Sequence, residues 1–116
     1  MKLLLVLLLL ASSLHAETIT AYCCCDICCG PRKDLLPSKK GHSSKRLAAN
    51  GKPPVEGVTC AGPRRLPLGT VVWIEGVGRR VVTDRTARRY DGRFDVYFNS
   101  HRDAKRFGIR QAKVKI

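Results

Sequence analysis

The sequence predicts a small all-β protein, a closed β-barrel with one short helix. Three observations predict this class. The chain has 116 residues, the length of one domain. Several short runs rich in β-branched residues are separated by turns that contain glycine or proline. One segment carries clear start and stop signals of a helix. The sequence contains no long repeat and no heptad pattern, which excludes solenoids and coiled coils.

The expected strands are short runs that alternate in polarity or are rich in β-branched residues. Residues 17–22 form the first, and residues 70–75 form the clearest. The others are expected at residues 58–61, 79–84, 94–98 and 110–116, with a short strand and turn at residues 46–51. Turns are expected at residues 52–57, 66–69 and 76–78, and a polar surface loop at residues 31–45.

The helix signal begins at Ser100. Serine is a good N-cap, and Asp103 three residues later resembles the second half of a capping box. Cations occupy the last expected turn, and Gly108 ends the helix. The sequence thus predicts one helix between the last two strands.

The first sixteen residues have the pattern of a secretory signal peptide. Lys2 precedes an unbroken apolar run at residues 3–10, and small residues lead up to Ala16. The run is shorter than the ~20 apolar residues that a membrane-spanning helix needs. We therefore expect a signal peptide at residues 1–16, one domain at residues 17–116 and no transmembrane span. The expected location is secreted or periplasmic, with outer-membrane association as an alternative.

The six cysteines form an uneven pattern, with five in a cluster and one apart. All are disulfide candidates: Cys23, Cys24, Cys25, Cys28, Cys29 and Cys60. An even count in a small exported chain favours disulfides, although spacing does not choose among the connectivities.

Zinc is the rival interpretation of the cysteines. The Cys25 and Cys28 pair has ligand spacing, but zinc sites usually add a second separated pair. Only Cys60, His42 and His101 lie outside the cluster to supply one. We therefore predict no metal and no cofactor. Free or mixed thiols stay open as a third interpretation, and a catalytic cysteine is disfavoured.

Four motifs lie at separate places in the chain. Residues 66–78 read LPLGTVVWIEGVG, and Asp84 precedes Asp95, within RFDVYF, by eleven positions. Residues 99–108 (NSHRDAKRFG) form the helix, and residues 22–30 read YCCCDICCG. Together they resemble the three-aspartate (3D) domain, a bacterial family related to membrane-bound lytic transglycosylase A. The resemblance covers nearly all of residues 18–116. It implies a six-stranded double-psi β-barrel, similar to expansin and rare-lipoprotein-A barrels, with one short helix.

The sequence departs from the family pattern at three places. Gly62, within CAGP, stands where the family has its first aspartate. The Gly-Gly pair after the second aspartate is replaced by RTAR at residues 85–88, and the usual TASG is AANG at residues 48–51. Two of the three signature acids remain, and the glycine-rich loop has become basic.

The resemblance implies cleavage of peptidoglycan. Related lytic transglycosylases break the β-1,4 bond between N-acetylmuramic acid and N-acetylglucosamine without water, leaving a 1,6-anhydro end. By motif match, Asp95 is the general acid and base, and Asp84 raises its pKa or orients the sugar. We also expect Arg93, Arg88 and Tyr97 to bind substrate.

The alternative for the two aspartates is purely structural. Strand acids near arginines are often plain ion pairs, and nearby arginines lower a carboxyl pKa. The arginines in question are Arg85, Arg88, Arg89 and Arg93.

The formal net charge of +13 favours an anionic partner. Coulomb attraction concentrates such a protein on peptidoglycan or another anionic cell-envelope polymer. Specific nucleic-acid binding is not expected, because aromatic residues make up only 6% of the chain. The charge also fits simple solvation of a small domain. Two functions therefore compete with the enzyme: a non-catalytic wall-binding barrel, and a cationic, disulfide-rich secreted factor that acts through its charge.

Overall fold

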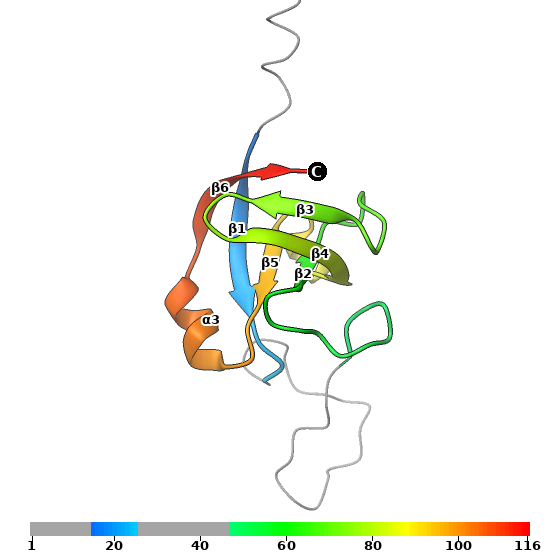
Figure 1. Cartoon of the computed structure of the whole chain (residues 1–116), viewed down its shortest axis with the longest axis vertical. Helices are drawn as coiled ribbons and strands as arrows, with labels where there is room; N and C mark the ends of the chain where they lie inside the picture. Colours follow the sequence, from blue (N-terminus) through cyan, green and yellow to red (C-terminus); the bar gives the residue numbers. More distant parts are fainter. Residues whose placement is uncertain (1–14, 26–46) are drawn as a thin grey trace, which may run out of the picture.

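The computed structural model describes residues 15–25 and 47–116. Six strands close into a barrel in the order β1-β5-β2-β4-β3-β6 (Figure 1). The strands are β1 (Ala16–Tyr22), β2 (Thr59–Gly62), β3 (Val71–Ile74), β4 (Gly78–Arg85), β5 (Phe94–Tyr97) and β6 (Arg110–Lys115). The predicted fold class, a small all-β barrel with a single short α-helix, is confirmed for this part of the chain.

The barrel mixes parallel and antiparallel pairs. β1 runs parallel to β5, and β2 runs parallel to β4. The other four neighbouring pairs are antiparallel. Because β1 and β5 are parallel, their carboxyl ends lie side by side, and Figure 1 shows the α-helix next to both of these ends.

The barrel interior is filled by aliphatic and aromatic side chains. Ile19, Val72, Val82, Phe94 and Val96 are completely buried. Burying one such side chain stabilises a fold by roughly 1.5–3 kcal/mol. Along β5, Phe94 and Val96 face this core. Because side chains alternate along a strand, Asp95 and Tyr97 point to the opposite face.

The α-helix, α3 (His101–Phe107), has the predicted ends. The Ser100 side chain accepts a hydrogen bond from the backbone N–H of Asp103, and Gly108 is the C-cap. Gly108 has a φ of 69°, in the left-handed region that glycine adopts without steric cost. Within the described residues, no helix has the length and apolar character needed to cross a membrane.

One local prediction needs correction, and one short element was not predicted. A short strand and turn were expected at residues 46–51, and the described part, residues 47–51, contains the turn but no strand; a bond of 2.9 Å from the Gly51 N–H to the Ala48 carbonyl closes it. The φ of Gly51 is 81°, which a strand does not contain. The sequence also did not indicate the short 3-10 helix η1 (Arg88–Tyr90) that precedes β5.

Other predictions lie outside the described residues. These are the apolar run of the signal peptide, Cys28, Cys29 and the polar loop at residues 31–45.

Candidate functional site

The two predicted catalytic acids flank one small residue. Ala61 on β2 is the register partner of both Asp84 on β4 and Asp95 on β5. Adjacent strands lie ~4.8 Å apart, so the two acids are two strand spacings apart. Ala61 is 2% exposed and packs in one cluster with Tyr22 and Tyr97. The structure thus brings the predicted pair together on one face.

A β-bulge determines where Asp84 points. Val82 pairs with Cys60 and faces the core, and the register then shifts so that Ala61 pairs with Asp84. Regular alternation would have put Asp84 on the same side as Val82. The extra residue, Thr83, turns Asp84 to the face of Ala61 instead.

Asp84 is oriented by three hydrogen-bond donors. The Tyr22 hydroxyl donates to Oδ2 at 2.7 Å. The backbone N–H groups of Arg85 and Ala49 donate to Oδ1 at 2.9 and 3.1 Å. Both carboxylate oxygens therefore act as acceptors, and the Asp84 side chain is held in one orientation.

Asp95 has a different environment. Burial raises the pKa of its carboxyl from 3.8 to about 6, against a lowering effect of the hydrogen bond from Thr20. The negative charge of Asp84 raises the pKa further, and the charge of Arg93 lowers it. The Thr20 hydroxyl donates to Oδ1 at 3.1 Å. The raised pKa places the protonation of Asp95 in the mildly acidic range.

The nearby arginines do not pair with the two acids. The Arg85 guanidinium donates to the carbonyls of Leu66 at 2.7 Å and Pro63 at 2.9 Å. Arg93 stacks 4.7 Å from the ring centroid of Tyr90. Within the described part of the chain, the ion pairs are Arg64 with Asp91 and Arg65 with Glu17. The ion-pair interpretation of Asp84 and Asp95 is therefore not supported there.

The three expected substrate-binding residues have different positions. Tyr97 is buried and packs edge-on against Tyr22, with ring centroids 5.4 Å apart. Arg93 is half-buried over Tyr90, whereas Arg88 is exposed on η1. Of these three, Tyr97 shares the face of the two acids, because it alternates with Val96 along β5.

Gly62 faces the core. A β-carbon on Gly62 would lie 2.8 Å from Cγ1 of Val82, which is completely buried. Position 62 in this barrel therefore has no room for a carboxylate beside Val82.

The described cysteines occupy two places. Cys60 is completely buried in the core, where burial raises the pKa of its thiol to about 12. Cys23, Cys24 and Cys25 follow the end of β1. No disulfide joins any two of these four, and the pairings that involve Cys28 or Cys29 stay predictions.

Sequence reasoning missed the residues that hold the acids in place. These are Thr20, Tyr22 and Ala61. The alternation along β1 could have indicated Thr20 and Tyr22, because it places their side chains on the face opposite Ile19. The bulge at Thr83 has no comparable sequence signal.

In comparisons with known proteins, no family model and no curated protein matches this chain.

Proposed function

We propose that this protein is a peptidoglycan-cleaving enzyme of the lytic transglycosylase type, built on a 3D-like double-psi barrel. The proposal rests above all on one observation: Asp95, with a pKa raised to about 6, lies across Ala61 from Asp84. A carboxyl group that is protonated at mildly acidic pH can serve as a general acid. A cell-envelope or extracellular location belongs to the same proposal.

A single carboxyl group suffices for the reaction. Protonated Asp95 donates its proton to the glycosidic oxygen as the bond to the anomeric carbon of N-acetylmuramic acid breaks. The resulting carboxylate then accepts the proton of the 6-hydroxyl as its oxygen attacks the anomeric carbon. The products are a 1,6-anhydro end and a free hydroxyl on N-acetylglucosamine, and Asp95 is again protonated.

Asp84 has a supporting role in this scheme. Its oxygens are engaged by Tyr22 and by two backbone N–H groups, so it accepts hydrogen bonds and does not deliver a proton. Its negative charge favours the protonated form of Asp95 and stabilises positive charge that develops on the sugar ring.

A wall-binding barrel without catalysis is the second candidate function. It is favoured by Gly62, because the first acid of the 3D pattern is missing here and Val82 occupies the space beside it. On this alternative, the basic surface would hold the protein on an anionic wall polymer, and the two remaining acids would only orient sugar.

The test uses protein purified as the expressing cell processes it. Wild type and Asp95→Asn are incubated with peptidoglycan sacculi, and the released muropeptides are analysed by mass spectrometry. Glu75→Gln is the matched control, since it removes one negative charge from an exposed turn. We expect 1,6-anhydro-muropeptides from the wild type and the control and none from Asp95→Asn.

Pelleting with sacculi separates the candidates. Asp95→Asn should still pellet with the sacculi, because the substitution leaves the basic surface intact. Pelleting of the wild type without release of anhydro-sugars would contradict the enzyme and support the wall-binding barrel. If moderate salt alone removed all pelleting and all release, charge would account for both.

A further inference from the structure

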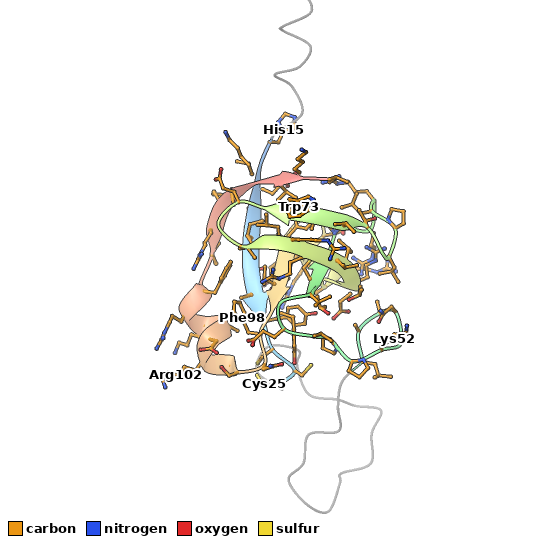
Figure 2. The ribbon with its side chains drawn as sticks, in the orientation of Figure 1. His15, Cys25, Lys52, Trp73, Phe98 and Arg102 are labelled. Carbon is orange, nitrogen blue, oxygen red and sulfur yellow. The ribbon has the colours of Figure 1, made fainter. Side chains whose placement is uncertain are left out.

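The carboxyl ends of β1 and β5 bring two cysteines and one histidine together. The parallel pairing continues one step beyond the strands, where the Phe98 N–H donates to the Tyr22 carbonyl at 2.9 Å. The chain therefore enters α3 beside the residues that follow β1. Figure 2 shows Cys25 and Phe98 at this end of the barrel. His101, the first residue of α3, faces Cys23 and Cys25.

The two cysteines share one side of the chain, and the cysteine between them has another environment. Cys24 packs against the cluster of Tyr22, Ala61 and Tyr97. Cys23 and Cys25 instead have their sulfur atoms 3.0 Å apart. Cys24 therefore points to one side of the chain, and the thiols of Cys23 and Cys25 point to the other side, toward His101.

The distances between the donor atoms suit a single metal ion. The His101 Nδ1 lies 3.3 Å from Sγ of Cys25 and 3.7 Å from Sγ of Cys23. All three donor atoms lie within 4.8 Å of one another. A tetrahedral zinc ion, with Zn–S of ~2.3 Å and Zn–N of ~2.0 Å, holds such donors ~3.5–3.8 Å apart. The two S–N distances lie close to that spacing, and the sulfur atoms need to separate by less than an ångström.

We propose that Cys23, Cys25 and His101 bind a thiophilic divalent metal ion, with Zn²⁺ as the natural occupant. Thiolate and imidazole are the ligands that zinc takes in structural sites, where four donors complete a tetrahedron. The sequence alone did not indicate this ligand set, because the two cysteines have Cys-x-Cys spacing and the histidine lies 76 positions away from Cys25.

A metal ion here ties the first turn of α3 to the end of β1. It fixes the segment that follows Tyr22, the residue whose hydroxyl donates to Asp84. The three donor residues include neither carboxyl group, so metal binding can be measured without the proposed glycan chemistry.

The test measures metal binding directly. The protein, purified as the cell processes it, is reduced, stripped with a chelator and titrated anaerobically with Co²⁺ and then Zn²⁺. Tetrahedral Co²⁺ bound by thiolates gives a sulfur-to-metal charge-transfer band and intense visible bands, which Zn²⁺ should abolish by displacement. We expect one metal ion per chain, confirmed by elemental analysis, and an increase in Tm on Zn²⁺ binding.

Single substitutions separate ligands from bystanders. Cys25→Ser and His101→Gln should weaken binding by more than the ~10–100-fold that is lost with a residue that only orients a ligand. Cys24→Ser is the matched control, because it removes the neighbouring thiol from outside the three-residue set. It should keep the affinity of the wild type. Cys25 and His101 are half-buried, so their variants should fold even if Cys23→Ser, in a buried position, does not.

Three results would overturn the metal site. One is failure of the reduced wild type to take up Co²⁺ or Zn²⁺ in a one-to-one ratio. Another is unchanged affinity in both Cys25→Ser and His101→Gln. The third is an equal loss of affinity in Cys24→Ser, which would indicate a nonspecific thiol cluster.

Discussion

The Tyr22 hydroxyl and the Asp84 carboxylate are joined by a 2.7 Å hydrogen bond that links β1 to β4, two strands that are not neighbours in the barrel. The bond passes across the face that also carries Ala61 and Asp95. Tyr22 is 7% exposed, so its hydroxyl depends on this protein partner. Burial and the neighbouring Asp84 both raise the pKa of Tyr22, which keeps the phenol protonated as a donor.

Tyr22→Phe should therefore weaken both the fold and the proposed site. The substitution removes the donor to Oδ2 of Asp84, and we expect a loss of about 1–2 kcal/mol in the free energy of unfolding, measured with urea. Because Tyr22 acts through Asp84, kcat for glycan cleavage should fall while KM stays near the wild-type value. Tyr97→Phe is the control, since Tyr97 shares the aromatic cluster and has no bond to either acid. Equal stability losses in the two variants would contradict the role given to the Tyr22–Asp84 bond.

The rate of the proposed glycan cleavage should depend on the protonation of Asp95. The general acid is present below a pH of about 6 and is lost as the pH rises through that value. We expect kcat/KM to decrease about tenfold per pH unit above this point. Asp84→Asn removes a charge that raises the pKa of Asp95, so the decrease should begin at lower pH in this variant. Glu75→Gln should leave the profile unchanged, and a profile unaffected by Asp84→Asn would refute the coupling.

The same titration has a consequence for stability. The pKa of Asp95 is 3.8 unfolded and about 6 folded, so the folded state holds the proton more tightly. Stability is then lost as the pH rises from about 4 to about 6, and it stays reduced above that. Asp95→Asn avoids this loss and should be more stable than the wild type by on the order of 3 kcal/mol near neutral pH. Near pH ~4 the difference should nearly vanish. Urea unfolding of both proteins at the two pH values checks the sign, and a stability difference that did not change with pH would count against the raised pKa.

The sequence predicted the barrel well because its signals are local. β-branched alternation located β1 and β3, and the Ser100 cap and Gly108 located α3. It predicted a short strand and turn at residues 46–51, but the described residues 47–51 contain only the turn, closed by the bond from Gly51 to Ala48. In such a short segment, the residue types do not distinguish a strand from a turn.

The site was predicted only in part, because its geometry depends on contacts distant in sequence. The sequence indicated Asp84 and Asp95 only through the resemblance of their spacing to a family motif. The bulge at Thr83 and the donors Thr20 and Tyr22 arise from strand pairings between distant segments. The meeting of His101 with Cys25 likewise requires knowing that β1 and β5 are parallel neighbours.

The packing of Gly62 against Val82 provides the last prediction. The φ of Gly62 is outside the left-handed region, so only the short contact with Val82 opposes a side chain there. Gly62→Ala should destabilise the barrel by about 1–3 kcal/mol through overpacking. Val82→Ala leaves space at the same point. The double variant with Gly62→Ala and Val82→Ala should therefore lose about 0.5–3 kcal/mol less stability than the sum of the two single losses.

A second glycine serves as the control for this cycle. Gly76 has a φ of 77°, and a β-carbon at this position would meet nothing within 4 Å, so Gly76→Ala costs stability through the backbone alone. Its loss should simply add to that of Val82→Ala, because the two positions share no contact. Additive losses for Gly62→Ala and Val82→Ala would show that the core yields to a β-carbon at position 62. In that case contact with Val82 would not be what limits the size of the side chain at position 62.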